Sequence, residues 1–296
     1  MTTETNALWK VWDDREPIKI PHTEYTLRGF SIAALRTNFY IKELSVMLDG
    51  GLSANLSPEH IFITHSHSDH IANLPFHLYS VKPDSQIQIY APQESCTRVN
   101  DYLQSILMIN ADCPDSDTTD PTRDPKDSCY KLNPVSPSTF DLTIRKKKFK
   151  IEVIKCYHGI PCVGYGFIEL RSKLKDEYVK LQSSEIGALR RQGIEVSHEV
   201  EFPIFCFLGD TSKDVLNDPA IEKYKNIMIE CTFIKDEDME QADKTFHMHW
   251  KYLEPYVRSH PDNTFILYHF SRRYKKTEVE DFFKTIDLVN IIPWIN

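Results

Sequence analysis

A run of metal-binding residue types follows an apolar segment in the first third of the chain. His65, His67, Asp69 and His70 come directly after residues 61–63, in the pattern H-x-H-x-D-H. Neutral imidazoles and carboxylates are ligands that zinc, manganese and iron accept in proteins. The alternative is a polar loop that carries its histidines by chance, but so dense a cluster favours a metal site. The reaction stays open at this point, because one such cluster supports several kinds of hydrolysis.

Further ligand-type residues follow apolar runs elsewhere in the chain. His158, Asp210 and His269 each stand at the end of a run of strand-forming residues. A buried strand that stops at a histidine or an aspartate places that side chain at the rim of its sheet. Together with the first cluster, these residues provide enough ligands for two metal ions that share one carboxylate. In such pairs the ions lie about 3.5–4 Å apart, and a bridging water becomes a hydroxide nucleophile near neutral pH.

Strands and helices that alternate along the chain are expected to position these residues. Alternating or short apolar runs predict strands over 25–35, 44–48, 61–63, 86–91, 149–157, 163–170, 204–208, 226–229 and 264–268. An apolar stripe at helical spacing predicts a helix that packs on the core: Val99, Tyr102, Leu103, Ile106 and Leu107. Helices are also expected over 71–81, over the charged stretch 172–193, and after a capping box that opens at Thr277. This alternation predicts sheets sandwiched between helices.

Size and composition are those of an ordinary globular protein. The 296 residues are 41% hydrophobic and 26% charged, and we expect one hydrolase domain over residues 1–296. Residues 112–138 are rich in Asp, Pro, Ser and Thr, which predicts an exposed insertion loop; a lid that faces the substrate is the alternative. The basic run 145–148 predicts a solvated hairpin tip, with a contact to RNA as the alternative.

Charge and cysteine usage limit the partners and the compartment. The net charge of −8 means that an RNA substrate needs a local basic patch or a metal centre to offset it. Seven scattered cysteines without a C-x-x-C pair predict reduced, buried thiols, as at Cys156, Cys206 and Cys231. No apolar run approaches the ~20 residues of a membrane span, and the first residues have no signal-peptide pattern. We therefore expect a cytoplasmic protein that makes no membrane contact.

The pattern at residues 65–70 resembles the signature loop of the metallo-β-lactamase superfamily. The resemblance implies an α/β fold of the αββα type, in which helices flank two mixed β-sheets and the site lies at one edge of the sheets. It also implies two divalent ions as cofactors, Zn²⁺ by expectation and Mn²⁺ or Fe²⁺ as alternatives. The implied ligands form one group for each ion and a bridging carboxylate: His65, His67 and His158; Asp69, His70 and His269; and Asp210.

Within that superfamily the chain is similar to ribonuclease Z, the tRNA 3′-processing endonuclease. Residues 230–233 (ECTF) resemble that family's E-A-T-F stretch, and residues 269–274 (HFSRRY) fit its H-x-S-x-R-Y ending. His247 falls where the family carries the histidine of its H-S-T motif. Because Met248 and His249 replace the usual Ser-Thr, His249 is an alternative for the catalytic histidine.

This resemblance implies a phosphodiesterase, and more narrowly an endoribonuclease that acts on pre-tRNA with a metal-bridging hydroxide as its nucleophile. Asp69 would take the proton of the nucleophile, and His247, held by Glu230, would protonate the departing oxygen. Ser271 and Arg273 would bind the phosphate, arginine through its forked donors. A homodimer is also expected from the family.

Other functions share parts of this pattern. Hydrolases of thioesters, lactones or β-lactams have the same metal loop, as do cyclic-nucleotide phosphodiesterases, and a scaffold subunit with an inactive site is a non-enzymatic alternative. The Glu230–His247 pair favours the phosphodiesterase. Many ribonuclease Z proteins insert a Gly/Pro-rich arm that grips the tRNA elbow between the positions of His158 and Asp210. Here that segment is short, charged and poor in glycine, which argues against a tRNA substrate.

Overall fold

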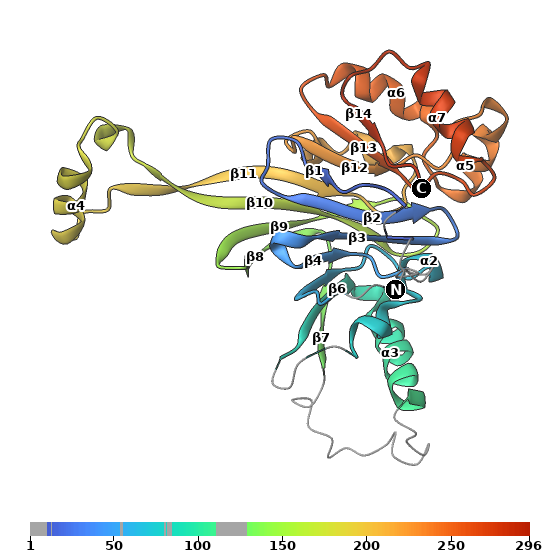
Figure 1. Ribbon diagram of the computed structural model, residues 1–296, viewed down its shortest axis with the longest axis horizontal. Helices are drawn as coiled ribbons and strands as arrows, with labels where there is room; N and C mark the ends of the chain where they lie inside the picture. Colours follow the sequence, from blue (N-terminus) through green and yellow to red (C-terminus); the bar gives the residue numbers. More distant parts are fainter. Residues whose placement is uncertain (1–10, 13, 54–55, 80, 82–84, 111–128) are drawn as a thin grey trace, which may run out of the picture.

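The computed structural model describes residues 11–12, 14–53, 56–79, 81, 85–110 and 129–296. Two seven-stranded sheets pack face to face with helices on their outer sides, so the predicted αββα sandwich is confirmed (Figure 1). The short helix α2 (Ser68–Ile71) and the longer α3 (Cys96–Asn110) lie on the side of the first sheet. Helices α5 (Met239–Thr245), α6 (Trp250–Ser259) and α7 (Lys276–Lys284) lie on the side of the second sheet.

The two sheets have the same pattern of antiparallel and parallel strand pairs, with the strands in chain order. The first sheet contains, in spatial order, β1 (Ile18–Lys19), β2 (Thr26–Ile32), β3 (Arg36–Ile41), β4 (Val46–Leu48), β5 (His60–Phe62), β6 (Ile87–Pro92) and β7 (Tyr130–Val135). The second contains β8 (Ser138–Ile144), β9 (Lys147–Cys156), β10 (Cys162–Leu174), β11 (Ser197–Phe207), β12 (Asn226–Glu230), β13 (Thr264–Tyr268) and β14 (Ile291–Pro293). In each sheet the first four strands pair antiparallel and the rest continue in parallel. No sequence repeat reveals this duplication.

Apolar residues that alternate along the strands fill the space between the sheets. Phe149, Ile151 and Val153 of β9 all face this core, as their alternation predicts. The rings of Phe39 in the first sheet and Phe207 in the second meet edge to face, with centroids 6.0 Å apart. Full burial of such side chains contributes about 1.5–3 kcal/mol each, and aromatic pairs add about 0.5–1.5 kcal/mol. The sheets are therefore held in a fixed relative position, which the site at their edge requires.

The predicted apolar stripe on α3 is confirmed as a core-facing stripe. Val99 and Leu103 are buried, and Tyr102 and Leu107 pack against the same cluster on the outer face of the first sheet. The helix predicted over 71–81 is wrong. Helix α2 ends at Ile71 and is followed by a 3-10 turn, η2 (Leu74–His77), that has a proline in its first turn; proline lacks the N–H that an α-helix interior needs.

The last helix begins slightly earlier than predicted. Its N-cap is Lys275, and the Glu278 carboxylate accepts a hydrogen bond from the Lys275 N–H at 2.7 Å. The capping box is therefore real but opens before Thr277, and the capping residue is a lysine that the usual preference for Ser, Thr, Asp or Asn would not select.

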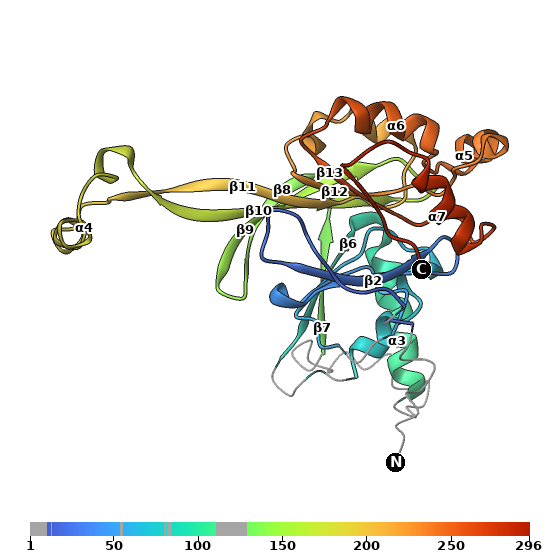
Figure 2. The ribbon, with the colours of Figure 1, turned by 45° about the horizontal axis from the view of Figure 1, so that its top comes forward.

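A long arm is the largest departure from the sequence-based expectation (Figures 1 and 2). Strands β10 and β11 continue past the sheet as a two-stranded ribbon, paired as far as Leu174 and Ser197. The tip carries a 3-10 turn, η6 (Asp176–Tyr178), and the helix α4 (Ser183–Arg191). The helix predicted over 172–193 is thus confirmed only in its second half. The segment judged too short and charged for an arm forms one, which we call the arm (residues 169–202).

The composition of the arm explains why it was missed. Helix α4 has no buried residue, and both faces of the ribbon are largely exposed. Without a buried face, the sequence carries no apolar alternation that would indicate strands. Local contacts stabilise the ribbon instead, such as the Arg171 guanidinium 4.6 Å from the centroid of the Phe202 ring.

Two smaller predictions concern the loops. Most of the predicted insertion loop over 112–138 lies outside the described residues, namely residues 112–128. The end of the loop was predicted too late in the chain, because Tyr130–Val135 forms strand β7. The basic run forms the predicted hairpin tip between β8 and β9, and Arg145 and Lys146 adopt φ values of 49° and 68° there. Two of its cations form exposed ion pairs, Arg145 with Glu59 at 2.8 Å and Lys148 with Glu199 at 3.0 Å. Exposed pairs of this kind contribute only about 0–1 kcal/mol, so the alternative contact to RNA stays a prediction.

The described cysteines are free, and Cys156, Cys206 and Cys231 are buried, as predicted. Within the described ranges, no helix is both long enough and apolar enough to cross a membrane.

Candidate metal centre and catalytic site

Loops at the ends of strands from both sheets carry the predicted ligands to one edge of the sandwich. His65 follows β5, His158 lies in the turn between β9 and β10, Asp210 follows β11 and His269 follows β13. Within each of three overlapping groups, the potential ligand atoms lie within 4.8 Å of one another. The groups are His65, His67, His158 and Asp210; Asp69, His70 and His269; and Asp210, His247 and His269. Residues far apart in the sequence are thus adjacent in space.

Asp210 lies between the first two groups. Its Oδ2 atom is 3.7 Å from Nε2 of His65, 3.6 Å from Nε2 of His70 and 3.3 Å from Nε2 of His269. Its Oδ1 atom is buried and has no hydrogen-bond partner in the described part of the chain. A buried carboxylate oxygen without a partner is costly. The donor set therefore fits a cation, and these residues could hold divalent metal.

Four of the five ligand histidines are oriented through the Nδ1 atom, whereas His67 presents its Nδ1 to the other ligands. The contacts of Nδ1 are His65 to Thr64 Oγ1 (3.0 Å), His70 to Asp49 Oδ2 (2.7 Å), His269 to Thr232 Oγ1 (2.9 Å) and His158 to the Phe246 carbonyl (3.2 Å). These contacts leave the Nε2 atom of each ring facing the other ligands. Such outer contacts fix ring orientation and tautomer in metal-binding histidines.

Asp49 is the clearest site residue that the sequence analysis missed. It follows β4 directly, is fully buried, and accepts hydrogen bonds from the Thr64 N–H (2.8 Å) and the Thr64 hydroxyl (3.0 Å). Its other oxygen accepts from His70. Burial raises the pKa of Asp49, and the charge and hydrogen bond of His70 oppose that rise. The available signal was a carboxylate after an apolar run, but Asp49-Gly50-Gly51 was interpreted as a turn only.

Backbone strain is concentrated around the site. Four non-glycine residues that touch it have a positive φ: Ala34 (56°), Asp49 (58°), Phe246 (57°) and His269 (65°). Each such conformation costs on the order of 1–3 kcal/mol. Two of these residues support ligands through the main chain, since the Ala34 N–H donates to Asp69 Oδ2 at 2.9 Å and the Phe246 carbonyl accepts from His158.

A buried carboxylate–histidine pair lies beside the ligands. The Nδ1 atom of His247 is 2.7 Å from Oε1 of Glu230, which is fully buried. The His247 ring lies 4.9 Å from the His158 ring and 5.4 Å from the His269 ring. Burial disfavours the charged imidazole, but the charge and hydrogen bond of Glu230 outweigh it and raise the pKa of His247 to about 9. A protonated imidazole is the form that can donate a proton to a departing oxygen.

Asp69 is kept ionised. Burial alone would raise its pKa, but the hydrogen bond from His269 and the charge of His70 outweigh that effect and lower the pKa to about 2. An ionised carboxylate is the form that both a metal ligand and a proton acceptor require.

His249 caps a helix and does not face the ligands. It is the N-cap of α6, where its Nδ1 accepts a hydrogen bond from the Lys251 N–H at 3.1 Å and its Nε2 is 2.8 Å from the Lys235 carbonyl. Both ring nitrogens are thus engaged away from the ligands. His247, and not His249, faces Glu230 and lines the cleft.

A cleft of about 470 Å³ opens in front of the ligands. Ser271 and Arg273, the predicted phosphate contacts, line it together with His247 and Asp69. Arg273 is 58% exposed, and its guanidinium is 3.3 Å from Asp238. Exposed ion pairs of this kind contribute only about 0–1 kcal/mol, so an incoming phosphate can compete for the guanidinium.

The fold and the site define a metal-dependent hydrolase of the metallo-β-lactamase fold. Among solved structures, the chain is similar to the metallo-β-lactamase fold protein YhfI of Bacillus subtilis (TM-score 0.54, 15% identity, 90% of this chain and 93% of that one). It is also similar to human tRNase Z, short form (ELAC1) (TM-score 0.57, 17% identity, 90% of this chain and 95% of that one). No protein-family model matches the chain.

The sequence relatives are named tRNase Z, zinc phosphodiesterase and ribonuclease Z. The chain is 28% identical over 268 residues to tRNase Z TRZ1 of Arabidopsis thaliana, an alignment that covers 87% of this chain and 89% of the relative. It is 25% identical to zinc phosphodiesterase ELAC protein 1 of Bos taurus, covering 73% and 72% of the two chains. It is 24% identical to ribonuclease Z of Staphylococcus saprophyticus, covering 79% and 78%. The chain is thus similar over most of its length to proteins named tRNase Z and ribonuclease Z.

Proposed function

We propose that the protein is an endoribonuclease that cleaves a phosphodiester at the 3′ side of pre-tRNA with two divalent ions, Zn²⁺ in the first instance. The observation that carries the proposal is the Glu230–His247 pair beside a full set of histidine and aspartate ligands. Hydrolysis of a thioester, lactone or β-lactam has no use for that pair. The relatives named tRNase Z and ribonuclease Z support the same assignment.

The ligand groups suggest how the ions are divided. His65, His67 and His158 would hold one ion, Asp69, His70 and His269 the other, and Asp210 would be shared. When bound, such ions activate a water nucleophile and neutralise charge on the phosphoryl oxygens.

The protein's own residues would move the protons and orient the phosphate. Asp69, held by the Ala34 N–H, would accept the proton of the attacking water. Because Glu230 accepts the hydrogen bond from Nδ1 of His247, the proton available for donation lies on Nε2, and we assign it to the departing oxygen. Ser271 and Arg273 would contact the non-bridging oxygens from the cleft wall.

The arm favours a large substrate over a small one. It projects far from the body of the protein (Figure 2), and α4 at its tip buries none of its residues while carrying Arg190 and Arg191 in its last turn. The presence of an arm removes the sequence-based argument against tRNA. The homodimer and the cytoplasmic location stay predictions.

The proposal is tested with the Zn²⁺- or Mn²⁺-loaded protein on pre-tRNA that carries a 3′ trailer and on bis(p-nitrophenyl) phosphate. We expect a single endonucleolytic cut in the pre-tRNA, together with slow hydrolysis of the aryl diester. An Asp210→Asn variant, which loses the shared ligand, is the control for metal dependence. Hydrolysis of the aryl diester alone would indicate that the substrate is a smaller phosphodiester and not RNA. Turnover of a lactone or thioester, with neither phosphodiester cleaved, would overturn the proposal.

A further inference from the structure

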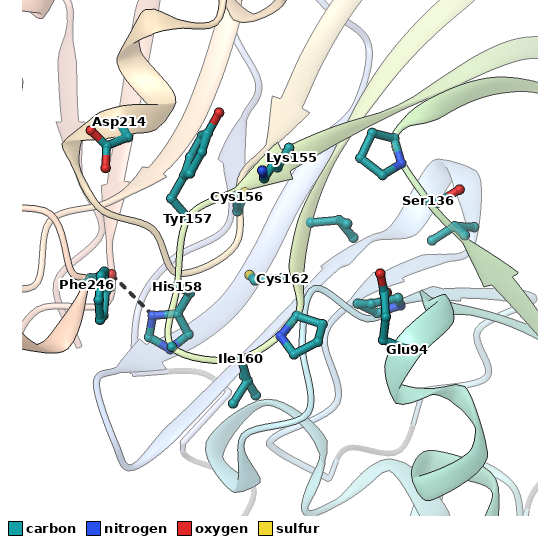
Figure 3. Close-up of a pocket in the computed structure, with 16 residues that line it drawn as sticks. Glu94, Ser136, Lys155, Cys156, Tyr157, His158, Ile160, Cys162, Asp214 and Phe246 are labelled. Atoms are coloured by element: carbon teal, nitrogen blue, oxygen red, sulfur yellow. Dashed lines mark hydrogen bonds between the residues drawn. The ribbon is translucent and has the colours of Figure 1, made fainter.

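A second pocket, of about 630 Å³, lies next to His158 (Figure 3). His158 lines this pocket, while its Nε2 atom is 3.2 Å from Nδ1 of His67, which lines the catalytic cleft. The walls come from both sheets, with Glu94 in the 3-10 turn η3 (Gln93–Ser95) after β6 and Tyr157 in the turn after β9. Pockets of about 300–1,000 Å³ accommodate small organic groups, so this one is large enough for a nucleoside.

Two exposed aromatic side chains line the pocket. Tyr157 is 36% exposed and Phe246 is 48% exposed. Their backbones are fixed: the Tyr157 N–H donates to Thr211 Oγ1 at 2.9 Å, and the Phe246 carbonyl accepts from His158 at 3.2 Å. An aromatic ring that is exposed to water but anchored by its main chain is suited to stacking on a nucleobase, because every base has an apolar face.

The charges of the lining favour a base over a bare phosphate. Lys155 is the one cation among the residues that line the pocket, whereas Glu94 and Asp214 are carboxylates there. The Lys155 ammonium lies 4.9 Å from the centroid of the Tyr157 ring. A phosphate alone would meet more negative than positive charge. A nucleotide would place its neutral base within reach of the carboxylates, which accept hydrogen bonds from exocyclic amino groups, and leave Lys155 for the flanking phosphate.

We infer that this pocket is a base-binding subsite for the nucleoside attached to the departing oxygen. The inference rests on the proposed function, in which His247 protonates that oxygen. The pocket lies close to His247, because its lining includes Phe246, the chain neighbour of His247, and His158, whose ring centroid is 4.9 Å from that of His247. Tyr157 and Phe246 stack on the base, and Lys155 contacts the backbone.

The experiment compares pre-tRNA substrates that carry an abasic residue at either nucleotide flanking the mapped cleavage site. In the metal-loaded wild-type enzyme, we expect the abasic residue on the side whose product ends in a free hydroxyl to lower kcat/KM by about 5- to 150-fold, the range of a base–aromatic stack. A loss only on the other side, whose product keeps the phosphate, would contradict the inference. Tyr157→Ala and Phe246→Ala are expected to lower kcat/KM on the natural substrate by a similar factor. On the abasic substrate they should add little, because the base they contact is already absent.

Three controls separate stacking from misfolding. Tyr157→Phe keeps the ring and should keep the discrimination against the abasic substrate. Phe76→Ala removes an aromatic side chain that is 55% exposed and is not among the residues lining this pocket, and it should leave the discrimination unchanged. The loss of pre-tRNA cleavage in Tyr157→Ala should exceed any loss on bis(p-nitrophenyl) phosphate.

The inference is overturned if the wild-type enzyme cleaves both abasic substrates as well as the natural one, or if the losses from Tyr157→Ala and from the missing base simply multiply. A wild-type enzyme that cleaves no RNA at all would instead refute the proposed function. The two failures are therefore distinguishable.

Discussion

Replacement of Asp49 by asparagine tests whether the ligands act as a metal site. Asp49→Asn keeps the shape of the side chain and one oxygen, which can still accept the hydrogen bond from the Thr64 N–H. The other oxygen becomes an amide that donates hydrogen bonds and meets Nδ1 of His70, 2.7 Å away in the wild type. To avoid two facing donors, His70 must take the tautomer that is protonated on Nε2. That nitrogen then has no free lone pair for a metal ion.

The size of the effect follows from the contact that is lost. A hydrogen bond to a charged group contributes about 1.5–3 kcal/mol, which corresponds to a loss of roughly 10- to 150-fold in metal affinity. Changes in such outer contacts typically cost about 10–100-fold. The metal-free fold should be weakened less, because a neutral His70 can accept a hydrogen bond from the new amide, so no charge is left buried without a partner.

The assay is competition for Zn²⁺ against a chelator of known affinity, together with thermal melts of metal-free and metal-loaded protein. We expect Asp49→Asn to lose most of the stabilisation that metal provides while its metal-free melting temperature stays close to that of the wild type. Thr64→Val, which removes the hydroxyl contacts to Asp49 and to Nδ1 of His65 but no charge, should give a smaller loss of affinity. A metal affinity for Asp49→Asn within about threefold of the wild type would refute the reasoning.

Three further predictions concern catalysis and pH. Glu230→Gln removes the charge that holds the pKa of His247 near 9 and should lower kcat on pre-tRNA by about 10²–10⁴-fold, with a smaller loss on an aryl diester whose departing group needs no proton. Asp69→Ala should abolish phosphodiester hydrolysis while circular dichroism shows an intact fold. Burial lowers the pKa of His60 and of His77 to about 4 from an ordinary 6.5; since the unfolded chain binds these protons first as pH falls, urea unfolding should show a stability loss of about 2 kcal/mol per histidine between pH 7 and pH 5.

For each of these three predictions, one result would contradict it. If Glu230→Gln lowered kcat equally on pre-tRNA and on the aryl diester, His247 would not be the proton donor. An unchanged rate for Asp69→Ala would contradict the assigned mechanism. A variant with both histidines replaced, His60→Phe and His77→Gln, should lose less stability on acidification than the wild type; the same acid sensitivity in both proteins would mean that other groups control it.

The sequence by itself determined the fold class and the chemical character of the site. His65, His67, Asp69 and His70 share one short loop, so the covalent chain holds them together whatever the rest of the molecule does. The fold class was also predictable, because strands with a buried face carry an apolar alternation that the two sheets require. His269 could be proposed from its place after an apolar run, but its distance from the loop could not.

The tertiary structure decided everything that depends on contacts between distant segments. Parallel pairing within each sheet and packing between the sheets place Asp210 within 3.7 Å of His65, and no local pattern encodes that distance. The same is true of Asp49, which looked like part of a turn until its contact with His70 was known. The choice of His247 over His249 depends on which ring reaches Glu230 and which caps α6. The arm escaped prediction for the opposite reason: it buries no face against the body, so its sequence has no need of the apolar pattern from which strands are recognised.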